Sequence, residues 1–116
     1  MSQHRFQAQT SSGRRVEVTI GYDRPLHGFF LVVMDADESD ADDEDVNVYC
    51  NLDDVELIDL GGLTLDLQYF KRKLALLGIA LAPTIEHELE EDRRQRVGNR
   101  VRLYDGAGQV LAGSGV

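Results

Sequence analysis

Hydrophobic and polar residues alternate over the first third of the chain. Phe6, Ala8 and Thr10 alternate with glutamines, and the alternation resumes over residues 16–22. A period of two predicts strands with one buried face. The turn-forming residues Ser11-Ser12-Gly13 separate the two stretches, so we expect strands one and two to form a hairpin.

Two further strands are expected before the middle of the chain. Phe29–Met34 is a continuous apolar run, which is typical of a central strand covered on both faces. The stretch before it contains a proline, which has no backbone N–H, and we interpret that stretch as a loop. Alternation over residues 46–51 predicts a fourth strand. Residues 35–45 then form the loop between strands three and four.

The second half of the chain changes to the period of a helix. Five apolar residues are spaced four, three, four and three apart, which places them on one helical stripe: Leu63, Leu67, Phe70, Leu74 and Leu77. Thr64 or Asp66 can cap the start of this helix, and Gly78 can end it in a left-handed conformation.

A second helix is predicted from Pro83 to about Gln95. Its apolar face consists of Ile85 and Leu89 alone, so we expect the helix to be largely exposed. The pairs Glu90 with Arg94 and Asp92 with Arg96 are four residues apart and can support it from outside. Beyond it, residues 100–111 predict a hairpin, and residues 112–116 are expected to be a frayed tail.

These patterns together predict an α+β fold. An antiparallel sheet of four main strands is packed by one amphipathic helix, and a polar second helix and a C-terminal hairpin are added. The length of 116 residues suits a single domain over residues 1–116. The chain has no apolar stretch of roughly 18 residues and no secretory signal pattern, so we expect a cytoplasmic protein that does not engage a membrane. Its single cysteine, Cys50, excludes an internal disulfide and a zinc site built from cysteines.

The negative charge of the chain is concentrated in one segment. The net charge is −9, and eight of the 21 acidic residues lie within residues 35–45. The remaining thirteen acids face twelve Lys and Arg, so the rest of the chain is nearly neutral. We call residues 35–45 the acidic segment; its acids are Asp35, Asp37, Glu38, Asp40, Asp42, Asp43, Glu44 and Asp45. Such a concentration predicts either a solvated loop or docking to a cationic surface, and it disfavours direct binding of nucleic acid.

Metal binding and catalysis have less support in the sequence. Asp35, Asp37 and Ser39 stand at alternate positions, as in a calcium-binding loop. However, Asp40 occupies the place of the required glycine and Val46 that of the closing glutamate. The three histidines lack metal-ligand spacing, and Cys50 is expected to be a small core residue. We therefore predict no enzyme, no catalytic residue, no metal site and no cofactor, and keep a divalent-cation-binding protein or a small enzyme as an alternative.

A basic stretch near the C-terminus is a candidate nucleic-acid site. Its arginines are Arg93, Arg94, Arg96, Arg100 and Arg102, and they follow five acids directly. Because those acids cancel much of the field, and because Tyr104 is the one aromatic nearby, this stretch is expected to be a self-paired surface.

A short motif resembles a known group of proteins. Residues 21–26 read G-Y-D-R-P-L and are followed by Phe29-Phe30, and Leu81-Ala82-Pro83 precedes an acidic helix that contains Asp92-Arg93. This pattern resembles small uncharacterised bacterial proteins with a G-[WY]-D-R-P-L…F-F motif, which are often borne by plasmids and integrated elements. The resemblance implies an accessory protein of a mobile element and no particular activity. Asp23 and Arg24 of this motif are expected in a turn, where they are candidates for partner binding.

The function predicted from the sequence is a noncatalytic module for protein–protein interaction. The acidic segment would dock on a basic protein surface, for example that of a nucleic-acid-binding protein. One alternative is an inhibitor that mimics nucleic acid, because carboxylates can occupy a groove built for phosphates. Small acidic inhibitors carried by phages and other mobile elements resemble this chain in size and charge. Whether the chain forms a homo-oligomer is left open.

Overall fold

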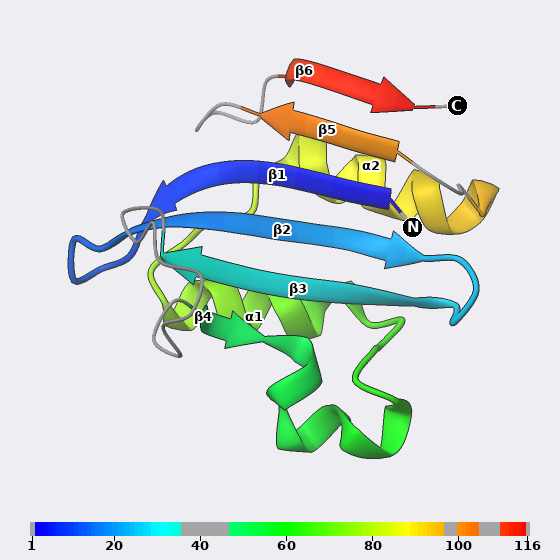
Figure 1. The fold of residues 1–116 in the computed structure, drawn as a ribbon, viewed down its shortest axis with the longest axis horizontal. Helices are drawn as coiled ribbons and strands as arrows, with labels where there is room; N and C mark the ends of the chain where they lie inside the picture. The colour runs from blue at the N-terminus through cyan, green and yellow to red at the C-terminus, as the bar shows by residue number, and fades with distance from the viewer. Residues whose placement is uncertain (1, 36–46, 97–99, 105–109, 116) are drawn as a thin grey trace.

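The computed structural model describes residues 2–35, 47–96, 100–104 and 110–115, which form one six-stranded sheet and two α-helices. The order of the strands across the sheet is β4-β3-β2-β1-β5-β6 (Figure 1). Their bounds are Ser2–Gln9 for β1, Arg15–Asp23 for β2, Gly28–Asp35 for β3, Asn47–Cys50 for β4, Arg100–Tyr104 for β5 and Val110–Gly115 for β6. The α+β fold predicted from the sequence is confirmed.

The sheet is mixed, and the C-terminal hairpin is part of it. Strands β1 to β4 follow one another as antiparallel neighbours, and β5 pairs with β6 in the same way. Strand β5, however, lies parallel to β1, with Ser2 opposite Arg100 and Phe6 opposite Tyr104. The two helices carry the chain back from β4, at one edge, to β1, and a connection of that length permits parallel pairing. Residues 112–115, predicted to be frayed, instead continue β6 as far as Gly115.

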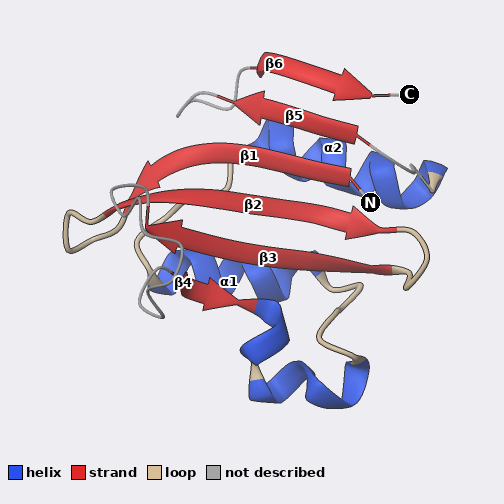
Figure 2. Ribbon diagram, viewed as in Figure 1, coloured by secondary structure: helices blue, strands red, loops and turns tan. Residues whose placement is uncertain are grey.

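Both helices cover the same face of the sheet (Figure 2). Helix α1 spans Leu67–Leu76 and begins after Asp66, whose carboxylate accepts a hydrogen bond from the Gln68 N–H. It ends before Gly78, which has a φ of 80°, so Asp66 as the cap and Gly78 as the end are confirmed. Leu63 and Thr64, by contrast, lie before the helix. Helix α2 spans Pro83–Gln95, which confirms its predicted bounds. No helix in the described part of the chain is long and apolar enough to cross a membrane.

The core lies between this face and the helices. Alternate residues of the central strands are fully buried, as the period of two predicts, and the helical stripe faces them. The buried side chains include Val18, Ile20, Leu31 and Val33 from the sheet and Phe70, Leu74, Ile85 and Leu89 from the helices. Each contributes on the order of 1.5–3 kcal/mol through removal of apolar surface from water.

The helices cover one face of strand β3 and the other face is covered only in part, so the prediction of a strand covered on both faces is wrong. Leu31 and Val33 are buried, whereas Met34 is 41% exposed. Phe30 nevertheless has little exposure, because its ring packs over Gly21 on the neighbouring strand. A Cβ atom at Gly21 would lie 2.7 Å from the Phe30 ring and 1.9 Å from the Ser2 carbonyl oxygen, so this position requires glycine.

Helix α2 is less exposed than predicted. Ile85, Leu89 and Asp92 are buried, at spacings of four and three. Counting apolar residues alone missed Asp92, which extends the buried stripe by one turn.

Two short 3-10 helices, η2 (Asn51–Asp53) and η3 (Val55–Leu60), connect β4 to α1 and were not predicted. The Asn51 side chain holds this connection, because its amide donates to the Gly62 carbonyl at 2.6 Å and its oxygen accepts from the Leu31 N–H at 3.4 Å.

Candidate functional site

The acidic segment begins at the end of β3. The Asp35 carboxylate accepts a hydrogen bond from Arg14 Nε at 2.5 Å. The other seven acids of the segment, Asp37, Glu38, Asp40, Asp42, Asp43, Glu44 and Asp45, lie outside the described residues.

Asp23 and Arg24 lie in the turn between β2 and β3, at the other end of β3. The Asp23 carboxylate accepts from the Leu26 N–H at 3.2 Å, and the His27 N–H donates to the Arg24 carbonyl at 3.2 Å. The predicted turn, with Asp23 accepting from a backbone amide, is therefore confirmed. Because Asp35 ends the same strand that this turn precedes, the structure does not bring the two predicted parts of the site together.

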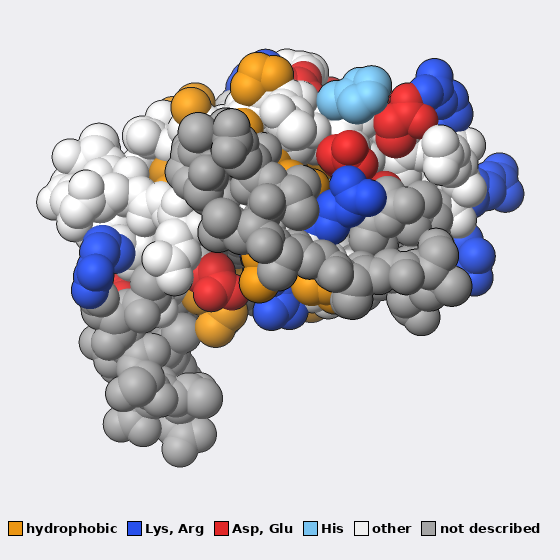
Figure 3. Space-filling model, turned by 90° about the horizontal axis from the view of Figure 1, so that it is seen from above, with side chains coloured by type: hydrophobic (Ala, Val, Ile, Leu, Met, Phe, Trp, Pro, Cys, Tyr) orange, Lys and Arg blue, Asp and Glu red, His pale blue; other side chains and the backbone are white. Residues whose placement is uncertain are grey.

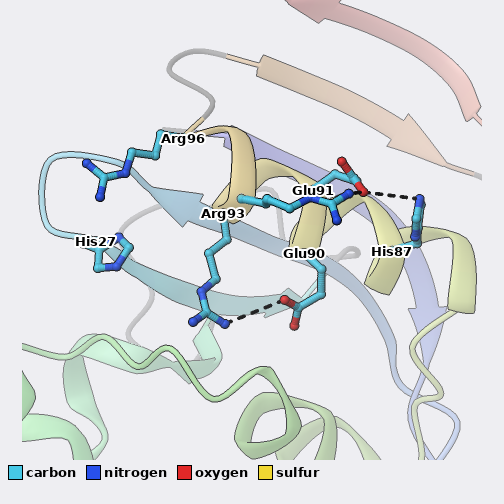
Figure 4. A pocket seen from close by; sticks show the side chains of 7 residues that line it. His27, His87, Glu90, Glu91, Arg93 and Arg96 are labelled. Atoms are coloured by element: carbon cyan, nitrogen blue, oxygen red, sulfur yellow. Dashed lines mark ion pairs between the residues drawn. The ribbon is translucent and has the colours of Figure 1, made fainter.

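The turn and the C-terminal half of α2 flank an open groove of about 630 Å³ (Figure 4). The groove is lined by three arginines, two histidines and two glutamates: Arg93, Arg94, Arg96, His27, His87, Glu90 and Glu91. Seen from above, basic and acidic side chains are interspersed over the right-hand half of the molecule (Figure 3). We call this hollow the α2 groove.

Ion pairs along α2 neutralise part of the α2 groove. Arg93 lies 3.8 Å from Glu90, and Arg94 pairs with Glu91. These pairs are three residues apart, in place of the predicted pairing of Glu90 with Arg94. For Arg96 no ion pair is present within the described residues, and its side chain is exposed.

Two residues of the α2 groove have an unusual backbone. His27 and Arg96 have φ values of 53° and 51°, and they are the non-glycine residues with positive φ in the described ranges. L-residues other than glycine disfavour this conformation, and such residues concentrate at functional sites. The Tyr22 hydroxyl, from a buried side chain of β2, lies 2.6 Å from His27 Nδ1 and fixes the imidazole.

A second polar cluster lies on the opposite, inner side of α2. His4 of β1 places Nε2 at 2.5 Å from the Asp92 carboxylate and Nδ1 at 2.7 Å from the Tyr104 hydroxyl. His4 and Asp92 are fully buried and Tyr104 nearly so. Burial, with Glu88 as the next cause, raises the pKa of the Tyr104 phenol to about 12. We call these three residues the sealed cluster; it resembles a general-base pair in its bonding, but no substrate reaches it in this conformation.

A third cluster surrounds Asp54, which precedes η3. Its Oδ2 atom accepts from the Tyr49 and Tyr69 hydroxyls, both at 2.7 Å, and Lys73 Nζ lies 3.7 Å away. Burial alone would raise the pKa of the Asp54 carboxyl. The hydrogen bonds from the two tyrosines and from the Glu56 N–H, together with the Lys73 charge, outweigh burial and hold that pKa below its ordinary value. Burial and the hydrogen bonds to Asp54 raise the pKa of both phenols. The cluster joins β4, η3 and α1, which makes its role structural.

Metal binding and cysteine chemistry gain no support from the described residues. In the ranges 2–35, 47–96, 100–104 and 110–115, no three His, Cys, Asp or Glu side chains gather to hold a metal ion. Cys50 is partly exposed at the end of β4. The comparisons with family models, curated proteins and solved structures found no match for this chain.

Sequence reasoning identified parts of these sites and missed how they combine. The sequence predicts a self-paired surface for the α2 arginines and a partner-binding turn between β2 and β3. No pattern in the sequence shows that these two regions line one groove. One sequence pattern could have indicated the sealed cluster: Asp92 follows Ile85 and Leu89 at helical spacing and therefore lies on the buried face of α2. No local pattern links His4 to Asp92, because 88 residues separate them.

Proposed function

We propose that this protein is a noncatalytic interaction module whose acidic segment docks on a basic surface of another protein. The observation that supports this proposal is the division of charge. Eight of the nine net negative charges belong to the acidic segment, and many charged groups of the body are paired with one another. Lys71 lies 3.2 Å from Glu86, and Arg102 lies 3.1 Å from Glu88.

This distribution favours a docking role for the acidic segment. Paired charges on the body produce little electric field beyond the surface. The fields of the eight like charges within residues 35–45 reinforce one another. A cationic partner is therefore attracted to one place on the molecule. The same charges keep the chain away from free nucleic acid.

The test is an affinity capture from the lysate of the native host. The wild-type chain is compared with a variant in which all eight acids of the segment are changed to Asn or Gln, and captured proteins are identified by mass spectrometry. We expect a basic protein that the wild type retains and the variant loses. Raising the salt from about 0.1 M to about 1 M shortens the screening length from about 10 Å to about 3 Å, and should release the same protein.

A matched pair of variants separates position from total charge. Asp42→Asn/Glu44→Gln removes two charges from the acidic segment, and Glu17→Gln/Asp59→Asn removes two from the body. We expect the first to weaken retention and the second to leave it unchanged. Equal retention by the wild type and the eight-acid variant would contradict the proposal.

A further inference from the structure

The α2 groove has features that the proposed docking of the acidic segment does not use. It lies at the β2–β3 turn, at the opposite end of β3 from Asp35. Its side chains are mainly hydrogen-bond donors with positive or titratable charge, which is the opposite chemistry to that of the acidic segment.

We propose that the α2 groove binds a small phosphorylated molecule, with a diphosphate group held by Arg93, Arg96 and His27. Figure 4 shows Arg93 and Arg96 extending from the C-terminal end of α2 toward the turn that carries His27, and all three line the same groove. Guanidinium groups match phosphate oxygens with two parallel hydrogen bonds each. The two guanidinium groups and the imidazole can thus donate hydrogen bonds to the oxygens of two adjacent phosphates.

The positions of these side chains are specified by the backbone. Arg96 stands at the C-terminal cap of α2, where glycine is the favoured residue. Its left-handed conformation turns the chain so that its side chain lines the same groove as Arg93. His27 has the same conformation in the turn, and its ring is fixed by Tyr22. The two left-handed residues thus fix where the backbone presents the Arg96 and His27 side chains.

The ion pairs in the groove leave the two arginines available. The 3.8 Å separation of Arg93 from Glu90 is long and both side chains are substantially exposed, so this pair stabilises the structure little and can be exchanged for a phosphate. The closer pair, Arg94 with Glu91, involves neither Arg93 nor Arg96. The volume of about 630 Å³ also lies in the range of sites for small molecules.

The net charge of −9 makes this proposal easy to distinguish from nonspecific attraction. At long range the molecule repels anions. Saturable binding of an anion must therefore come from short-range contacts at a local site.

The probe is inorganic pyrophosphate, titrated into the full chain by calorimetry at low ionic strength. Arg96→Gln is compared with Arg72→Gln, a change of the same charge at an exposed arginine of α1 outside the groove. We expect saturable binding by the wild type, at least a tenfold loss in Arg96→Gln, and a change of less than twofold in Arg72→Gln. His27→Asn, which tolerates the same backbone conformation, should also weaken binding.

Three outcomes would overturn the proposal. One is the absence of saturable binding to the wild type. The second is an equal loss in Arg96→Gln and Arg72→Gln, which would indicate nonspecific charge. The third is saturable binding of an octaglutamate peptide together with no response to pyrophosphate, which would assign the groove to an acidic protein segment. Circular dichroism of each variant confirms that it is folded.

Discussion

The two sides of helix α2 carry similar residue types in opposite surroundings. On the inner side Asp92 is fully buried and bonded to His4, and on the outer side Arg93 and Arg96 line a groove open to water. The inner group joins α2 to β1 and β5 and is closed to any ligand. The outer arginines line one hollow together with His27 of the β2–β3 turn, and Arg93 has only an exposed ion pair with Glu90. Polar residues one position apart on a helix can therefore serve stability and binding separately.

The largest effect is expected where the inner side is broken. Asp92→Ala leaves the buried His4 imidazole without its carboxylate, and a buried polar group left without its partner costs about 3 kcal/mol at the upper end. Urea denaturation should show a free energy of unfolding lower by that amount. Asp59→Ala, at an exposed acid, should change it by less than about 0.5 kcal/mol. Similar small losses in both variants would show that the sealed cluster does not hold α2 to the sheet.

A smaller loss is expected from the other contact of His4. Tyr104→Phe keeps the ring of β5 in the core but removes the hydroxyl 2.7 Å from His4 Nδ1. An unsatisfied buried nitrogen costs about 1–3 kcal/mol. Thermal unfolding followed by circular dichroism measures this cost, and Tyr22→Phe, which frees a partly exposed imidazole, should cost less. A larger loss in Tyr22→Phe than in Tyr104→Phe would contradict the assignment of His4 to the buried side of α2 and His27 to the exposed side.

On the outer side we expect a substitution that stabilises the protein. Arg96→Gly removes a disfavoured left-handed conformation and should raise the free energy of unfolding by about 1 kcal/mol. Arg94→Gly, two residues earlier and inside the helix, should lower it by about 1 kcal/mol. Chemical denaturation of both variants gives the two signs. A loss of stability in Arg96→Gly would mean that the conformation at this position is not strained.

The smallest effect concerns Asp54 and acid. Because its folded pKa lies below the ordinary value of 3.8, its ionised form stabilises the fold above that value. The contribution disappears as the pH falls through the folded pKa. The difference in unfolding free energy between the wild type and Asp54→Asn should thus shrink as the pH is lowered from about 4. A difference that stays constant down to pH 2 would exclude this linkage.

The fold could be predicted from the sequence where local patterns decide it. The ends of α1 follow from the capping carboxylate of Asp66 and from Gly78, and the start of α2 follows from Pro83. The parallel pairing of β5 with β1 could not be predicted, because it depends on how the helices return the chain across the sheet. Nor could the one-sided burial of β3, since a continuous apolar run does not reveal what covers it.

The candidate site was only partly predictable for the same reason. The turn at Asp23 follows from its residue types, whereas the proximity of His27 to Arg96 depends on contacts between distant segments. Asp92 shows the limit most clearly. Its spacing to Arg96 suggested a surface pair, while its spacing to Leu89 placed it on the buried stripe, and only the packing of β1 against α2 decides between them.

The three histidines of the chain provide the most direct test of the division between the two sides of α2. Their imidazole signals can be followed by NMR in the full chain while pyrophosphate is added. We predict that the signal of His27, which belongs to the proposed diphosphate site, shifts in a saturable way. The signal of His4, in the sealed cluster, should stay in place. If His4 shifts as much as His27, or if His27 does not respond, the outer side of α2 is not the binding side.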